Sequence, residues 1–468
     1  MTSSRWLRLP FNVTPLVLAL ALASPALYAQ DQAQTPNPSD ALAAADPASP
    51  STQSALPLPA PLQTQAPTPP DDIEQARAVW RQANARVAEF PRGHADLLRW
   101  EAAQQPPPPS ATSAQAAAAP LGLDEALRLS LPLRPELFTR PGMNEREQAL
   151  VRRALAEHAR TLQQAWIDAV ALRQSARLRQ AVLEAAQTGS ELSRRMVQAG
   201  NASQAALLRE QLVEADAWTA SAKAEAAARA ATSRLAALLG VWQASAVEAL
   251  GRRLPASLPA LPATLQPGAG LTVADIEGAA LRSHPDLPTL RRETELALAA
   301  LPAQRWQAWQ AAQQAALQAL PAPGSAPLKP PHLTDLSLLG DHTLARATQQ
   351  HNRLLALATE RRAMARDAWT QLQLRHAGAR HSEEVVAGLQ TALEQDTVLR
   401  YSGMLQSTWQ LLASARDRLA ALDAAALARR DYWRAQADWQ ALLAGADYDG
   451  SNASTFDTGG RSAARGGH

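Results

Sequence analysis

Apolar residues recur along the middle of the chain with the spacing of long helices that pack side by side. Over 155–169 and again over 178–196, apolar positions alternate between steps of three and four residues. This seam is typical of helices that pack at shallow angles over many turns. It predicts a helix over 143–199 and a return helix over 204–239, roughly 85 Å and 54 Å long at about 1.5 Å per residue.

The distribution of proline supports the same elements. The chain has 34 prolines, but none lies between Gly142 and Leu254 or after Pro331. Because a proline inside a helix costs about 3 kcal/mol, these two stretches are where long helices can run without a break. The sequence therefore predicts a mainly α fold.

A four-residue break separates the first two predicted helices. Gly200 can adopt the left-handed backbone that ends a helix, and Ser203 can cap the next helix by accepting from its first N–H groups. We therefore expect an antiparallel helical hairpin with its turn at Gly200, Asn201 and Ser203. An ordinary loop between two bundle helices would have the same signature.

The turn occurs a second time, 204 residues later. Ser203 corresponds to Ser407, the leucine pair 207–208 corresponds to 411–412, and Gly403 lies just before the second serine. A repeated turn at a constant offset favours an internal duplication over chance similarity between alanine-rich segments.

A second pair of matching segments, called here the markers, precedes the long helices. LGLDEALRLSLPLRPEL at 121–137 and LTVADIEGAALRSHPDL at 271–287 differ by 150 residues. The order marker, long helix, turn and return helix thus occurs twice. The second copy is 54 residues longer between its marker and its turn.

The chain ends and linkers differ in composition from these repeats. Two arginines, a short apolar stretch and a small-residue exit open the chain, an order typical of a secretory signal and too short for a retained transmembrane helix. The predicted organisation is a signal peptide (1–29), a disordered Pro/Ala-rich spacer (30–70), a short helical unit (71–103), a linker (104–120), the first hairpin repeat (121–254), a linker (255–270), the second hairpin repeat (271–445) and a disordered tail (446–468).

Three strings in the two repeats resemble the outer membrane efflux proteins, the TolC family. They are ALRLSLPLRPEL in the first marker, QAGNASQAALLREQL at the first turn and RYSGMLQSTWQLL at the second. The order of elements over 121–445 follows the duplication of that family. Residues 71–103 resemble the N-terminal helical extension of a branch often found with copper-resistance functions.

The resemblance implies an exported protein of a Gram-negative envelope, found in the outer membrane or the periplasm. Members of the family are homotrimers whose hairpins form a hollow α-helical barrel, and whose turns meet a periplasmic adaptor linked to an inner-membrane pump. Carried over by position, the adaptor-binding tips are Gly200, Asn201, Ser203, Leu207 and Leu208, and Gly403, Ser407, Leu411 and Leu412. The leucines fit the hairpin core equally well.

One departure from the family concerns the membrane β-strands that normally follow each marker. A membrane strand needs about 9–11 residues, but only eleven residues, including Pro141 and Gly142, separate Leu137 from Ala149. In the second copy only HLTDLSLL at 332–339 resembles a single strand, and the preceding residues have a helical composition. We therefore expect the membrane strands to be absent or vestigial.

The sequence offers no chemistry for catalysis or for a cofactor. It has no cysteine, a formal charge of +2, no phosphate loop and no nucleophile motif, so we expect no enzyme, cofactor or nucleic-acid partner. Only His376 and His381 lie close together, and five residues do not place them on one helix face. We interpret them as exposed helical residues and expect no metal site.

These observations predict a passive outer-membrane efflux component for solutes or metal ions, working with an adaptor and a pump. The alternative is a periplasmic coiled-coil interaction protein that keeps the adaptor-binding tips without the membrane strands. A periplasmic enzyme ranks third because no catalytic motif supports it.

Overall fold

The computed structural model describes residues 119–265, 272–320 and 330–448, together with four residues between 74 and 81. All of them belong to one unit of the chain, Ser51–His468. The predicted signal peptide, spacer and 104–118 lie outside the described residues. So do nearly all of the short helical unit and the tail from 449 onward.

The described part of the chain is built from helices and contains no strand, which confirms the prediction of a mainly α fold. The first repeat holds α4 (Leu123–Ser130), two 3₁₀ turns (Leu131–Leu133 and Pro135–Leu137), α5 (Glu145–Gln198), α6 (Gln204–Leu238) and α7 (Ala244–Arg253). The second holds α8 (Val273–Ser283), α9 (Leu287–Ala299), α10 (Ala303–Gln318), α11 (Leu336–Leu339), α12 (His342–Arg380), the π-helical segment η4 (His381–Val386), α13 (Ala387–Ser402) and α14 (Thr408–Leu443).

The first hairpin has the long helices that its apolar seam predicts. α5 spans 54 residues and α6 spans 35. α5 starts at a capping box, in which Asn144 accepts from the backbone of Glu147 and the Glu147 carboxylate accepts from the backbone of Asn144. The short segment after the first marker therefore leads directly into a capped helix.

The second hairpin is longer because three further helices precede its long helix. α9, α10 and α11 lie between the second marker and α12, and α12, η4 and α13 then run without interruption to the second turn. The helical composition before residue 320 correctly indicates α10. The suggestion of a strand at 332–339 is wrong, because Leu336–Leu339 form one helical turn and the residues before it have no regular structure.

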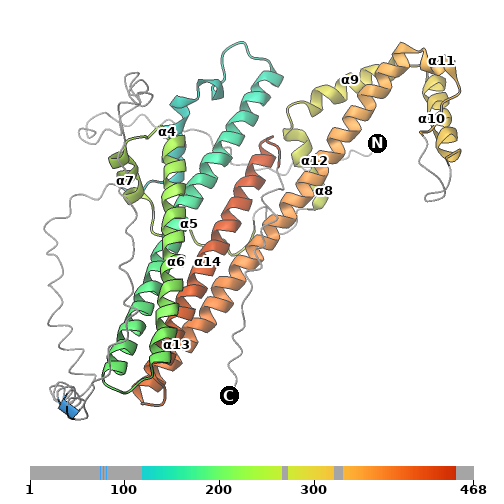
Figure 1. Cartoon of the computed structure of the whole chain (residues 1–468). Helices are drawn as coiled ribbons and strands as arrows, with labels where there is room; N and C mark the ends of the chain where they lie inside the picture. Colours follow the sequence, from blue (N-terminus) through green and yellow to red (C-terminus); the bar gives the residue numbers. More distant parts are fainter. Residues whose placement is uncertain are drawn as a thin grey trace, which may run out of the picture. The chain divides into compact units, whose positions relative to one another are not determined.

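The long helices form a row in which α5 packs against both α6 and α14, and α14 also packs against α12 and α13 (Figure 1). α5 and α14 are antiparallel. Two ion pairs show this, because Asp168 pairs with Arg434 while Arg179, further along α5, pairs with the earlier Asp423 of α14. The two hairpins are thereby joined through α5 and α14.

Small and aliphatic side chains fill the interior of this row. Leu162, Val170 and Leu235 are fully buried with the first marker, and Leu372 and Leu442 are fully buried in the second repeat. Alanine supplies many of the remaining buried positions, which lets helix backbones approach closely. Apolar burial therefore holds the hairpins together without any disulfide.

The linker predicted at 255–270 is described as far as residue 265 and lies against helices of both repeats. Its backbone carbonyls accept from helix side chains: Ala256 O from Arg177 of α5, and Pro259 O from the Trp433 indole at 3.1 Å. Leu258 of the linker is itself buried, in the core of the first repeat. The linker thus ties the first hairpin to α14.

Candidate functional site: the two hairpin tips

The first tip has the turn that its sequence predicts. Gly200 has a φ of +73°, and the backbone N–H of Asn201 donates to Met196 O at 2.8 Å, which closes the helix end in a Schellman motif. Ser203 then caps α6, its hydroxyl accepting from the backbone N–H of Ala206. Gly200 and Ser203 therefore act as expected in the turn.

The second tip repeats this geometry with one difference. Ser407 caps α14 in a capping box with Gln410, and Leu405 N donates to Arg400 O at 2.9 Å, as in the first tip. The left-handed residue, however, is Met404, with a φ of +57°, whereas Gly403 has a φ of −83°. The constant offset of 204 places Met404, and not Gly403, at the position that corresponds to Gly200.

The predicted tip residues differ in their accessibility. Gly200, Asn201, Ser203, Gly403 and Ser407 are exposed. Among the leucines, Leu208 is exposed, Leu411 and Leu412 are partly buried, and Leu207 is 3% exposed. Leu207 therefore belongs to the hairpin core and offers no surface to a partner, which resolves for this residue the alternative that the sequence left open.

The tips of the two hairpins lie side by side at one end of the helix row (Figure 1). Just behind them, Arg416 Nη1 of α14 lies 3.6 Å from Glu210 Oε2 of α6. A side chain added at Gly189 of α5 would contact Leu412 of α14 at 3.6 Å. Segments about 200 residues apart in sequence thus form one continuous end surface.

Met404 and Leu405 are exposed apolar residues at this surface that are not among the tip residues predicted from the sequence. Met404 is 94% exposed and Leu405 is 79% exposed. Leu212, which extends the first tip along α6, is 67% exposed. The repeat itself carries a signal for Met404, because adding the offset of 204 to Gly200 leads to this residue.

Arginines surround the tips. Arg194 and Arg195 both bond to Glu191, and the hydrogen bond from Arg194, followed by that from Arg195, holds the pKa of the Glu191 carboxyl below its usual range. At the second tip Arg400 pairs with Asp396 at 2.7 Å. The carboxylates are therefore engaged within each helix, while the arginine side chains extend into solvent.

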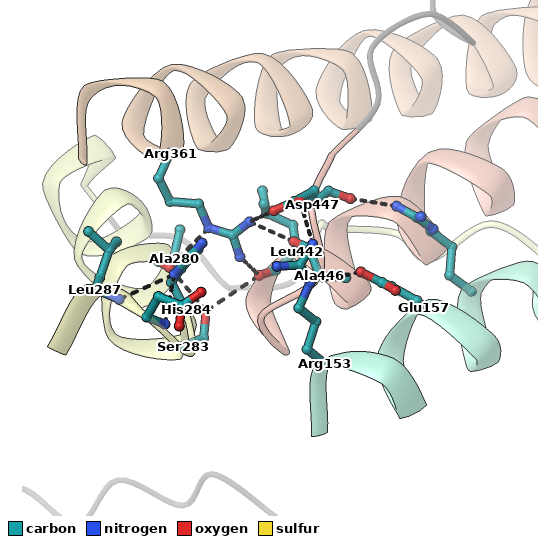
Figure 2. Close-up of polar contacts among 12 residues, drawn as sticks. Arg153, Glu157, Ala280, Ser283, His284, Leu287, Arg361, Leu442, Ala446 and Asp447 are labelled. Atoms are coloured by element: carbon teal, nitrogen blue, oxygen red, sulfur yellow. Dashed lines mark hydrogen bonds and ion pairs between the residues drawn. The ribbon is translucent and has the colours of Figure 1, made fainter. Parts of the chain in front are cut away.

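A polar cluster at the C-terminal end of α14, which is the end away from the tip, stabilises the fold (Figure 2). Arg361 is 1% exposed and donates to the carbonyl oxygens of Ala280, Leu442 and Ala446. Burial lowers the pKa of its guanidinium to about 10. Since backbone carbonyls occupy its donors, Arg361 fastens the end of α14 to α8 and is not available for chemistry.

The two neighbouring histidines differ in their surroundings. His376 is 8% exposed, and its Nε2 donates to Pro262 O at 2.8 Å, so its interpretation as an exposed residue is wrong: it anchors the linker. His381 is exposed. Within the described residues no three histidine or carboxylate side chains gather as metal ligands would.

None of the described helices combines the length and the apolar character needed to cross a bilayer.

Comparisons with known proteins give matches among solved structures alone. No protein-family model matches the sequence, and no curated protein matches it. The outer-membrane channel OprN is 19% identical over 69% of this chain and 72% of its own, with a TM-score of 0.43. CusC, studied for transmembrane channel formation, is 13% identical over 80% of this chain and 92% of its own, also at 0.43.

A third match is VceC, an outer membrane protein of Vibrio cholerae, which is 17% identical over 64% of this chain and 73% of its own, with a TM-score of 0.41. The chain is similar to outer-membrane channel proteins. That is the class its sequence resembles. These three identities are below 20% and the three TM-scores are below 0.5, so the likeness alone does not establish a function.

Proposed function

We propose that this protein is the outer-membrane component of a TolC-type tripartite export system, a passive conduit for solutes or metal ions. Its hairpin tips would bind a periplasmic adaptor, which links the conduit to an inner-membrane pump. The observation that carries the proposal is the pair of matched tips. Both have a left-handed residue, a Schellman bond and a serine cap at equivalent positions, and both lie at one end surface.

The edges of the helix row support assembly into a homotrimer. α6 and α13 flank the row, and each carries apolar residues directed to solvent: Leu212 is 67% exposed on α6, and Leu389 and Leu393 on α13 are 67% and 53% exposed. A row with two apolar edges can bury both by joining copies edge to edge. Three copies would close the α-helical tunnel that the sequence resemblance implies.

Envelope fractionation tests the proposal. The full-length protein, expressed in a Gram-negative host, should sediment with the outer membrane and should form trimers that survive mild detergent. Recovery as a soluble periplasmic monomer would contradict a conduit. A periplasmic protein with an unrelated helical bundle is the fractionation control.

The alternative is a periplasmic coiled-coil interaction protein that binds the adaptor through the same tips without conducting solutes. It is favoured by the helices α9, α10 and α11, which occupy the place between the second marker and α12. Adaptor binding by a protein recovered in the soluble periplasmic fraction would support this alternative. Failure of adaptor binding would remove both functions.

A further inference from the structure

The two tips share a backbone but present different chemistry. The first exposes Gly200 and Asn201, whereas the second exposes Met404 and Leu405. These two have the largest exposed fractions among the exposed large hydrophobic side chains that the structure describes, at 94% and 79%. The tips are therefore equivalent in fold and unequal as surfaces.

Met404 also occupies a backbone conformation that suits glycine. Four helix ends close with the same Schellman bond, and at three of them the left-handed residue is a glycine: Gly200, Gly240 and Gly445. Met404 is the exception among the described residues. Left-handed backbone is unfavourable for a residue with a Cβ, and the exposed side chain has little contact within the chain to offset this. Such strain at an exposed position indicates a role outside the folded chain.

The surroundings of this pair are cationic. Arg195 is 73% exposed beside the first tip and Arg400 is 56% exposed before the second, while Arg209 of α6 is also exposed. Glu191 and Asp396 neutralise part of this charge, since they pair with Arg194, Arg195 and Arg400, and the surplus of arginines over carboxylates leaves the surface positive. A partner at this surface is therefore favoured if it surrounds an apolar pocket with carboxylates.

We propose that Met404 and Leu405 form an apolar prong that inserts into a pocket of the periplasmic adaptor, a pocket rimmed by acidic side chains. This inference rests on the proposed function and adds which tip provides the anchor. A methionine side chain is flexible and polarisable, so it can fill an irregular pocket, and a few buried apolar anchors commonly dominate an interface. The first tip, whose turn exposes Gly200 and Asn201 at the matching positions, then contributes rim contacts.

Binding and stability measured together test the prong. Full-length wild type and variants are immobilised in mild detergent, and each purified periplasmic adaptor of the source bacterium is applied as the probe. Met404→Gly and Leu405→Ser should each weaken binding at least tenfold. Met404→Gly should at the same time raise the melting temperature by about 1–2 °C, because glycine relieves the left-handed strain. A residue with only a structural role would not move the two readouts in opposite directions.

Gly378→Ala is the matched control, because Gly378 lies in α12 outside both tips, is exposed, and an added Cβ there meets nothing within 4 Å. It should leave binding within twofold of wild type. The exchange Gly200→Met with Met404→Gly transfers the methionine to the first tip and should not restore affinity. Restored affinity would overturn the assignment of the anchor to the second tip.

The remaining outcomes separate this inference from the proposed function. If an adaptor binds wild type and both prong variants equally, the prong is overturned and the export function stands. If no adaptor binds wild type, the export function fails and the prong fails with it. Flotation with phosphatidylcholine vesicles that depends on Met404 and Leu405, without adaptor binding, would identify a lipid surface as the partner and would equally overturn the proposal.

Discussion

At the scale of single residues, the tips show how a sequence can predict a turn and misplace one residue within it. Glycine at a helix end, followed by a capping serine, correctly predicts the first tip, because both residues satisfy backbone groups that the helix leaves free. The same rule favours Gly403 at the second tip. The left-handed position is instead held by Met404, which a rule based on residue preference cannot identify.

The two tip glycines should therefore respond differently to substitution. Gly200→Ala places a Cβ on left-handed backbone and should lower the free energy of unfolding by about 1 kcal/mol. Gly403→Ala should change it by less than about 0.5 kcal/mol, because its φ is negative and its surroundings have room. Urea unfolding followed by circular dichroism measures both. Equal losses would contradict the assignment of the left-handed residues.

Buried histidines near the markers should make stability depend on pH. Burial, and then the charge of Arg361, lowers the pKa of His284, whose Nδ1 accepts from the backbone N–H groups of Asp286 and Leu287. Burial, followed by the charge of Arg134, likewise lowers the pKa of His158. Because each pKa is lower in the folded chain than in the unfolded one, the folded state binds fewer protons at mildly acidic pH.

The contribution of these histidines is thus complete above about pH 6.5, the unfolded value, and is lost as the pH falls toward the folded values. Unfolding free energies measured between pH 7.5 and pH 5 should decline by up to about 1.4 kcal/mol per pH unit for each histidine. His284→Asn keeps an acceptor for the two backbone N–H groups and should flatten the decline. An unchanged profile in this variant would rule out His284 as a source.

At the scale of elements, the helices could be predicted because the evidence for them is local. The apolar seam and the absence of proline determine where α5 and α6 run, and the repeated turn predicts the second hairpin. The positions of the ion pairs between helices could not be predicted in this way. Whether Asp423 meets Arg179 depends on the register of α14 against α5, which is a property of the packed row.

Removing Arg179 and removing Asp423 should lower the free energy of unfolding by different amounts. Asp423 is 1% exposed, whereas the side chain of Arg179 is 37% exposed, and their closest atoms are 2.7 Å apart. Arg179→Ala would strand a buried carboxylate and should cost about 3 kcal/mol. Asp423→Ala leaves an arginine that reaches water and should cost about 1 kcal/mol. The double variant should be more stable than Arg179→Ala alone, and urea unfolding of all three proteins checks this order.

At the scale of the whole molecule, the feature that sequence periodicity does not reveal is which helix faces remain uncovered. α5 and α14 have neighbours on both sides, whereas α6 and α13 end the row. The repeat pattern treats α6 and α14 as equivalent return helices, yet α14 lies inside the row and α6 lies at its edge. Their different environments arise only when the two hairpins pack together.

Leu389 lies on α13, at one edge of the helix row. Leu389 is 67% exposed within the single chain, so Leu389→Glu should leave the fold and its helical circular dichroism unchanged. If α13 joins α6 of another copy, the buried glutamate would disrupt that contact, because an unpaired charge in an apolar interface is unfavourable. Mass photometry of the detergent-solubilised protein should then show monomers where wild type shows trimers.

Gln395→Glu, at an exposed polar position of α13, introduces the same charge and should still assemble. Trimers in both variants would show that this edge is free, and dissociation of both would point to a general effect of charge.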